Sequence, residues 1–444
     1  MPKPIHAPSQ LYSSNFSRSL SITATLFSLL LVGLLGLRLV SLVPTPGHHL
    51  NYIYNSSKND KLEQPFQVQV GLRPYYLVDN MDEGALKQKL QSCSEETSKV
   101  SKFVVGHRGA PLQFPEHTRE SYMAAAREGA GAIECDVTFT SDKKLVCRHD
   151  QLMRPTHHNQ HPRHLPRIQM HPALHALQPR NRRPRNSQLL HQRHHARRIQ
   201  NPLRQDGRLQ PQRQHGHGIH GRHGRFRTDL YSTCGTLLTH VESIALIDSY
   251  GRDFTPEAKG PVVHVRGYTR ARFLQDIIDD YKALGIDPAR VWPQSFVPED
   301  VFWWIAHEPE FGAQAVYLDE RMETQEGYRA ATASLAGLAR QGVRIVGPAL
   351  FALTKLDGEG RIVPSEYAVE ARKAGLEMLP WSFERSGWLN EGGEYFYQYI
   401  APVIRKDGDM YTVLDVLVND VGIFKMYSDS PATVVYYANC MGLP

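Results

Sequence analysis

Cysteine is scarce in this chain, since only five of its 444 residues are Cys. No two of them have the spacing of a zinc site, which excludes a zinc-finger module. Their number is odd, and Cys135 and Cys147 lie in strand-like runs, where buried packing residues are expected. Cysteine use alone therefore does not fix the compartment in which the protein works.

Lysine and glutamate are missing from the middle of the chain. Residues 151–225 contain no Lys, Glu, Val, Tyr, Phe, Trp or Cys, but they hold 15 Arg, 13 His and one acidic residue, Asp206. Because the whole chain has a net charge of +6, the rest of it is acidic. Taken as it stands, the stretch would be a basic tract for nucleic acid or acidic lipid, or a His-rich tract for metal.

A shift of the reading frame explains this composition better than a basic insertion does. With a free choice of synonymous bases, reading one base later turns the stretch from Arg154 into DLHTTTNIL, and later parts regain an amphipathic pattern. The normal frame resumes near Arg227 in this interpretation. We therefore interpret residues 152–226 as frameshifted. As written they are expected to be disordered, because they offer few apolar residues to bury.

A long apolar run near the start predicts a membrane or export segment. The run from Leu20 to Val43 is about long enough to span a bilayer. Lys3 and Arg18 precede it and favour a cytosolic N-terminus. Because no clear small-residue cleavage site follows, a signal anchor is favoured over a cleaved signal peptide. We expect a basic tail at 1–18, the anchor or signal peptide at 19–43 and a linker at 44–100. The main domain is then lumenal or extracellular on a membrane anchor, or secreted.

From residue 101 to residue 444, strand-like and helix-like runs alternate. The strand-like runs are 103–107, 132–140, 144–149, 253–259, 290–296, 315–319, 343–347, 377–383 and 422–428. The helical runs between them include 270–283, 299–307, 328–340 and 366–373. This alternation predicts an α/β domain with a parallel sheet, and we expect a TIM-type (β/α)8 barrel.

Nine strand-like runs are one more than such a barrel needs. The link between the second and third runs, residues 141–143, is too short for a crossover helix. Either these two runs form a hairpin, or the barrel is irregular at this point.

Charged side chains and histidines gather where the strand-like runs end, which is where parallel barrels carry their catalytic groups. They are His107, Arg108, Glu134, Asp136, His149, Glu257 and Lys259. Glu134 and Asp136 are two residues apart in a strand, so both carboxylates point to one face. Paired acidic oxygens on one face suit a hard divalent cation such as Mg²⁺ or Ca²⁺.

Two histidines, three carboxylates, an Arg and a Lys together provide what cleavage of a phosphodiester requires. A metal and the basic side chains neutralise the phosphate. One imidazole takes a proton from the attacking hydroxyl, and the other gives a proton to the leaving alcohol. The ordinary imidazole pKa of about 6.5 suits both tasks.

The motifs that carry these residues also resemble a known family. HRGA, PEHT and IECDVTFTSDKKLVCRHD resemble the opening of the glycerophosphodiester phosphodiesterase family, and TPEAK, WPQSF, LPWSFERSG and YSDSPATV continue the resemblance. It covers residues 104–150 and 228–443. The long form, with RTDLYSTCGTLLTHVESIALI after the anomalous stretch, is similar to the fungal members.

The resemblance implies a role for each motif residue. His107 and His149 would be the catalytic acid and base, in an order that the sequence leaves open. Glu134, Asp136 and Glu257 would hold the metal, and Arg108 and Lys259 would contact the phosphate. The family hydrolyses glycerophosphodiesters to glycerol 3-phosphate and an alcohol, so the expected partners are a glycerophosphodiester or lipid substrate and, through the N-terminal segment, a membrane, with no nucleic acid.

Four other residues lie near strand ends, and three of them have two possible roles. Glu116 would support the first loop. Phe296 and Trp381 either line the pocket or pack in the core, and Asp429 either contributes to the site or caps the final helix.

Two other functions remain open at this stage. One is a related phosphodiesterase of the phospholipase D, sphingomyelinase D or phospholipase C type, and the acidic trio favours metal-dependent members of that group. The other is an inactive, membrane-anchored binding protein that uses the basic tract. That interpretation leaves the ordered set of His, Glu and Asp unexplained.

Overall fold

The computed structural model describes residues 67–149, 151, 230, 235–260 and 265–444, which belong to one compact unit of the chain. The expected tail at 1–18, the apolar segment at 19–43 and the segment 152–226 interpreted as frameshifted lie outside these residues. Within the described part, no helix is both long enough and apolar enough to cross a bilayer.

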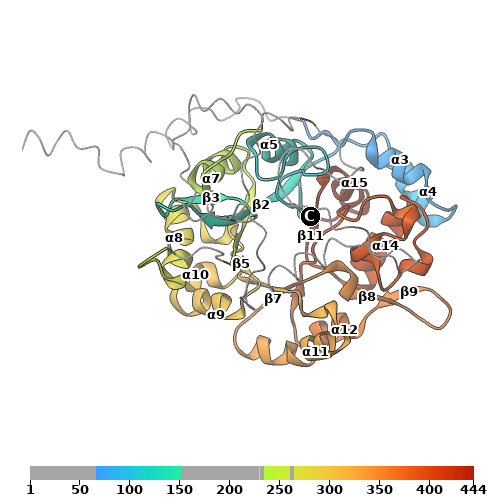
Figure 1. The fold of residues 1–444 in the computed structure, drawn as a ribbon. Coiled ribbons are helices and arrows are strands. Elements are labelled where there is room, and N and C mark those ends of the chain that lie inside the picture. Colours follow the sequence, from blue (N-terminus) through green and yellow to red (C-terminus); the bar gives the residue numbers. More distant parts are fainter. Residues whose placement is uncertain (1–66, 150, 152–229, 231–234, 261–264) are drawn as a thin grey trace, which may run out of the picture. The chain divides into compact units, whose positions relative to one another are not determined.

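Eight parallel strands form the centre of the domain, and helices surround them (Figure 1). Around the sheet the order is β10, β7, β6, β5, β4, β2, β1 and β11. The bounds are β1 Ser101–Gly106, β2 Ala130–Phe139, β4 Asp253–Ala258, β5 Gln294–Ser295, β6 Val316–Asp319, β7 Ile345–Pro348, β10 Glu377–Met378 and β11 Met426–Ser428.

Backbone hydrogen bonds also link the two ends of this order. The N–H of Phe424 donates to the carbonyl of Met378 at 2.8 Å, and the N–H of Phe383 donates to the carbonyl of Tyr427 at 2.8 Å. The sheet therefore curls round on itself, consistent with the TIM-type fold expected from the alternation.

The expected ambiguity at the second and third strand-like runs is resolved as a hairpin. β3, Leu145–Cys147, pairs antiparallel with β2 and lies off the main path of the sheet. A second hairpin, which the sequence did not signal, joins β8, Thr354–Leu356, to β9, Ile362–Pro364.

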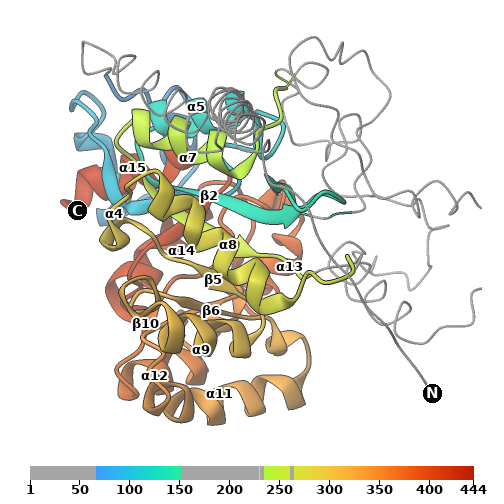
Figure 2. The same ribbon diagram turned by 90° about the vertical axis from the view of Figure 1, so that its left-hand side faces the viewer.

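The helices lie along the outside of the strands in both views (Figures 1 and 2). They include α5 Arg119–Arg127, α7 His240–Ser249, α8 Arg270–Ala283, α9 Pro298–His307, α10 Pro309–Gly312, α11 Gln325–Arg340, α12 Glu366–Lys373, α13 Glu394–Tyr397, α14 Asp409–Val416 and α15 Pro431–Met441. Four of them, α8, α9, α11 and α12, match the helical runs expected from the sequence. Thr118 and Thr239 cap α5 and α7 through their side chains, which satisfies first-turn N–H groups.

Residues from the strands, together with two residues that flank strands, form a hydrophobic cluster inside the sheet. They are Val105, Ala132, Trp292, Val316, Leu318, Ile345, Leu379 and Tyr427. Alternate residues of a strand share a face. The residues that follow Val105 and Ala132 at even spacing, His107, Glu134 and Asp136, are therefore directed to the same interior, towards the carboxyl ends of the strands.

Residues 67–100, which were assigned to the end of a linker, contain two helices. These are α3, Arg73–Asp79, and α4, Ala85–Ser92, with Leu77 and Leu90 fully buried. A disulfide joins Cys93, at the end of α4, to Cys440 in α15. Cys135 and Cys147, expected as packing residues, are buried and are joined by a second disulfide between β2 and β3.

Candidate active site

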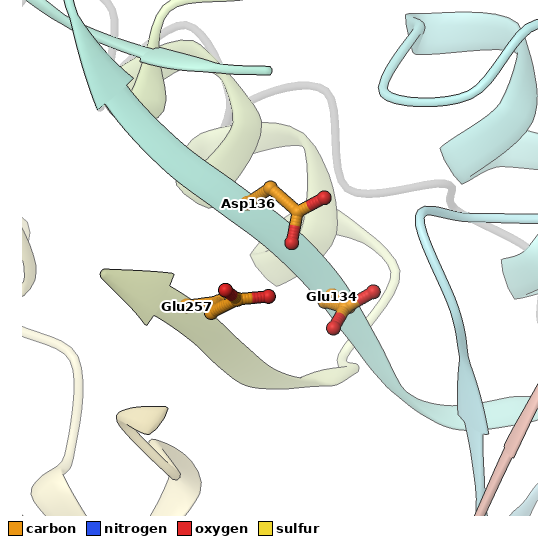
Figure 3. A group of neighbouring side chains, drawn as sticks. All are labelled: Glu134, Asp136 and Glu257. Carbon is orange, nitrogen blue, oxygen red and sulfur yellow. The ribbon is translucent and has the colours of Figure 1, made fainter. Parts of the chain in front are cut away.

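Three buried carboxylates meet at the carboxyl end of β2 and β4 (Figure 3). Glu134 and Asp136 project from β2, and Glu257 projects from β4, where it is paired directly with Asp136 across the sheet. One oxygen from each carboxylate lies within 4.8 Å of the others. The even spacing in β2 and the parallel register of β4 therefore bring the predicted metal-binding residues together.

Neighbouring side chains and backbone bond several oxygens of Glu134 and Asp136. The side-chain amide of Gln294 donates to Glu134 Oε1 at 2.8 Å, and the N–H of Arg108 donates to Glu134 Oε2 at 3.0 Å. His117 Nε2 lies 2.8 Å from Asp136 Oδ2. Asp136 Oδ1 is buried without a hydrogen-bond partner in the described part of the chain.

The electrostatics of the trio favour a cation. Burial and the charge of Asp136 raise the pKa of Glu134 well above its ordinary value, and burial likewise raises the pKa of Glu257 to about 8. Although burial opposes it, the charge of Arg108 and Lys259 holds the pKa of Asp136 well below its ordinary value. An all-oxygen donor set with an unpartnered buried atom fits a hard divalent ion such as Mg²⁺ or Ca²⁺.

His107 follows β1 directly and faces the trio. Its Nε2 lies 3.6 Å from Glu134 Oε2, and its Nδ1 lies 2.6 Å from Asp429 Oδ1 and 3.1 Å from the hydroxyl of Ser382. Burial and the nearby Arg108 lower the pKa of His107 to about 4. The ring therefore carries no charge at neutral pH, and its Nδ1 is the atom committed to Asp429.

Arg108 lies between acidic groups. Its guanidinium contacts Glu116 at 3.1 Å and Asp136 at 3.2 Å. Its backbone has a φ of 56°, and the next residue, Gly109, has a φ of 94°. A Cβ at Gly109 would overlap Ser121 of α5, so the tight turn that aims Arg108 at the carboxylates requires glycine there.

His149 and Lys259 complete the set expected from the sequence. Lys259 Nζ contacts Glu257 at 2.7 Å and lies 5.7 Å from the centre of the Phe296 ring. His149 is half-buried just beyond β3. Burial and the positive charges of Arg108 and Lys259 hold the pKa of His149 well below its ordinary value. Arg108 and Lys259 are therefore near enough to His149 to act on it electrostatically.

Several residues of the site were not singled out from the sequence. Gln294, His117, Ser382 and Arg385 each contact one of the predicted groups, and Arg385 joins Glu116 to Asp429 at 3.2 and 2.9 Å. Each lies inside one of the motifs WPQSF, PEHT and LPWSFERSG, which was the available signal. Asp429 contributes to the site, while α15 begins after Ser430 without a side-chain cap. Phe296 and Trp381 pack on the interior cluster and on each other.

Comparison with known proteins agrees with these features. Residues 107–195 match the model of the "Glycerophosphoryl diester phosphodiesterase family". An "Extracellular protein" of Arthroderma benhamiae is 48% identical over 226 residues, which are 49% of this chain and 92% of the relative. A "Probable glycerophosphodiester phosphodiesterase 1" of Mycobacterium tuberculosis is 52% identical over 54 residues, which are 12% of this chain and 20% of the relative.

Among solved structures, a putative glycerophosphoryl diester phosphodiesterase from Silicibacter pomeroyi is 18% identical, with a TM-score of 0.47. The match covers 80% of this chain and 98% of that one. The family model begins at His107 and takes in Glu134, Asp136 and His149, and the relative from Arthroderma benhamiae is matched over nearly its whole length. The chain therefore belongs to the glycerophosphoryl diester phosphodiesterase family.

Proposed function

We propose that this protein hydrolyses glycerophosphodiesters to glycerol 3-phosphate and an alcohol, with the help of a divalent cation. The observation that carries the proposal is the buried trio of Glu134, Asp136 and Glu257, flanked by His107 and by the two basic side chains Arg108 and Lys259. This arrangement combines binding of a phosphate with proton transfer.

Glu134, Asp136 and Glu257 are the residues that would hold Mg²⁺ or Ca²⁺. When bound, such an ion supplies positive charge against the phosphate oxygens as negative charge develops there. Gln294 bonds one oxygen of Glu134 and His117 bonds one oxygen of Asp136, which holds these two carboxylates in place. Neighbours of this kind fix ligand orientation in metal sites.

Hydrolysis breaks the bond from phosphorus to the head-group oxygen and forms a bond from phosphorus to the attacking oxygen. One proton must leave the attacking water, and one must reach the departing alcohol. His107 and His149 are the two proton carriers of the proposal. Because Nδ1 of His107 is bonded to Asp429, Nε2 is the atom that exchanges a proton with the substrate.

Arg108 and Lys259 bring positive charge to the same place. Both already pair with carboxylates of the site, Arg108 with Asp136 and Lys259 with Glu257. We propose that they orient the phosphodiester through charge-assisted hydrogen bonds, which are stronger than neutral ones. His107, Arg108, Glu134, Asp136 and Glu257 are each buried, and a low local dielectric strengthens interactions between charged groups.

The proposed location is outside the cytosol, with the protein secreted. Two disulfides, Cys93–Cys440 and Cys135–Cys147, are typical of an oxidising compartment. The relative from Arthroderma benhamiae bears the name "Extracellular protein". The segment 19–43, expected to be an anchor or a signal peptide, would direct this export.

The test is turnover of glycerophosphocholine by the purified full-length chain, with glycerol 3-phosphate and choline measured separately. Both products should appear in equal amounts. A chelator should abolish turnover, and added Mg²⁺ or Ca²⁺ should restore it. Release of phosphocholine in place of choline would reassign the enzyme to the phospholipase C type. No turnover in either metal would contradict the proposal.

A pair of matched variants tests whether the reaction depends on the buried trio. Glu257→Gln removes one charge from the trio and should lower kcat by more than about a hundredfold, given that even neighbours of metal ligands cost ~10–100-fold. Glu370→Gln makes the same change in an exposed ion pair with Lys373 on α12 and should leave kcat unchanged. Equal activity of both variants would remove the trio from the mechanism.

A further inference from the structure

The disulfide Cys135–Cys147 lies directly behind the proposed catalytic groups. Cys135 stands between Glu134 and Asp136 in β2, and Cys147 is two residues before His149. We infer that this disulfide is a positioning element, which fixes β3 and therefore His149 against the carboxylates of β2. The inference rests on the proposed function, because it concerns the placement of a proposed proton carrier.

The alternation along β2 separates the disulfide from the substrate. Ala132, Glu134 and Asp136 share the interior face of the strand, so Cys135 points to the opposite face, where the helices lie. Cys135 is 2% exposed and Cys147 is 1% exposed. The disulfide therefore does not contact the substrate, and any effect on catalysis must act through the residues next to it in the chain.

In the described part of the chain, β3 is attached mainly through its pairing with β2 and through a hydrogen bond of 3.3 Å from the N–H of Cys147 to the carbonyl of Leu238. The strand is three residues long, and three residue pairs join it to β2. An isolated bridge joins Val146 to Thr239 on its other side. Short two-stranded pairings are marginal by themselves, so a covalent link to β2 adds substantially to the fixing of this strand.

The path of the chain after β3 explains why His149 depends on the link. The N–H of Arg148 donates to the carbonyl of Asp136 at 2.7 Å. The chain therefore runs back along β2, past Asp136, as it reaches His149. A shift of β3 along or away from β2 would carry His149 away from the trio, while Glu134 and Asp136 would stay, since β2 is also paired with β1 and β4.

The second disulfide of the chain provides a matched control. Cys93–Cys440 joins α4 to α15, with 347 residues of sequence separation against 12 for Cys135–Cys147. Closing a longer loop removes more entropy from the unfolded chain. A purely stabilising role therefore predicts the larger loss of stability, and any accompanying loss of activity, when Cys93–Cys440 is removed.

The experiment compares C135A/C147A and C93A/C440A with the wild-type full-length chain. For C135A/C147A we expect kcat to fall at least about tenfold, because misplacement of a catalytic group by about 1 Å can cost ~100-fold. KM should stay within about threefold, since Arg108 and Lys259 remain. For C93A/C440A we expect a larger fall in Tm and a kcat within about twofold of wild type.

A readout that needs no turnover separates this inference from the proposed function. Hydrogen exchange over residues 144–149 should accelerate in C135A/C147A and stay unchanged in C93A/C440A. Unchanged exchange in this segment would overturn the inference even for a chain without activity. A wild-type chain that binds metal but turns over no glycerophosphodiester would instead count against the proposed function.

If C135A/C147A does not fold, partial reduction of the disulfides in the wild-type protein provides a second test. Folded wild-type protein is treated with a phosphine reductant, alkylated and mapped by mass spectrometry. Loss of activity should follow alkylation of Cys135 and Cys147 and not that of Cys93 and Cys440. Full activity in molecules with Cys135 and Cys147 alkylated, or equal loss of kcat in both double variants, would overturn the inference.

Discussion

The imidazole of His107 and the carboxylate of Asp429 are 322 residues apart in the chain and are joined by a hydrogen bond of 2.6 Å between Nδ1 and Oδ1. His107 is 6% exposed and Asp429 is fully buried, so the bond is shielded from water. Asp429 is in turn held by Arg385 at 2.9 Å. The loop after β11 therefore sets the orientation of a ring that belongs to the loop after β1.

Asp429→Asn is expected to lower kcat at least about a hundredfold with a small change in KM. An amide can donate to Nδ1 and so place the ring proton on Nε2, the wrong atom. The same substitution in the Ser-His-Asp triad of proteases costs ~10⁴-fold. The measurement is steady-state kinetics with glycerophosphocholine, with Asp415→Asn in α14 as the control. A kcat within threefold of wild type would show that the bond does not orient the ring.

Gln294→Ala is expected to weaken divalent cation binding about tenfold. The amide of Gln294 donates to Glu134 and accepts from the hydroxyl of Tyr427, which fixes the carboxylate from behind. Loss of such a neighbour typically costs ~10–100-fold in affinity. Calorimetric titration with Ca²⁺ or Mg²⁺ measures this. Gln275→Ala, on α8, is the control, and an affinity equal to that of wild type in Gln294→Ala would contradict the prediction.

Lys425→Met is expected to stabilise the protein at neutral pH. Burial lowers the pKa of Lys425 to about 8 from an ordinary value of 10.5, despite the opposing charge of Asp253. The folded state therefore disfavours the charged amine, by at most about 3 kcal/mol. Part of this gain is offset, because the variant loses the hydrogen bond from Nζ to the carbonyl of Lys102 and the contact of Nζ with the Trp292 ring, whose centre is 4.8 Å away.

The sign of the pH dependence follows from linkage. Between pH 8 and 10.5 the unfolded wild-type chain binds more protons at Lys425 than the folded one, so wild-type stability rises with pH there. The advantage of Lys425→Met should be largest below pH 8 and should shrink towards pH 10.5. Unfolding free energies at a series of pH values test this, with Lys89→Met, at an exposed position, as the control. An advantage independent of pH would disprove the assigned cause.

Sequencing of the transcript across the codons for Gln151 to Thr228 is expected to reveal a single-base insertion or deletion at each edge of the Arg- and His-rich segment. The reason is the composition of the segment. A solvated basic segment is expected to contain Lys as well as Arg, but this one has 15 Arg and no Lys. Activity is then compared between the corrected chain and the chain as written. A transcript that encodes the segment unchanged would establish the tract as real, and its binding to anionic ligands would become the next question.

Local patterns predicted the strands and several of the charged residues that lie together at the candidate site. β-rich runs with turns between them corresponded to nine of the described strands, and four helical runs corresponded to α8, α9, α11 and α12. The period of two along β2 predicted that Glu134 and Asp136 share a face. Residues 73–92 gave no comparable signal, because α3 and α4 are short helices of seven and eight residues whose burial depends on α14 and α15.

The sequence by itself determined which residues lie at strand ends and which of them share a face. Side chains alternate between the two faces of a strand, so this property depends only on local spacing. Which of these residues touch was decided by the tertiary structure. The register of β2 against β4 brings Asp136 to Glu257, the curling of the sheet brings Asp429 to His107, and the hairpin of β2 and β3 brings Cys147 to Cys135. Contacts across strands depend on pairing partners and on closure of the sheet, and no local pattern of residues specifies those.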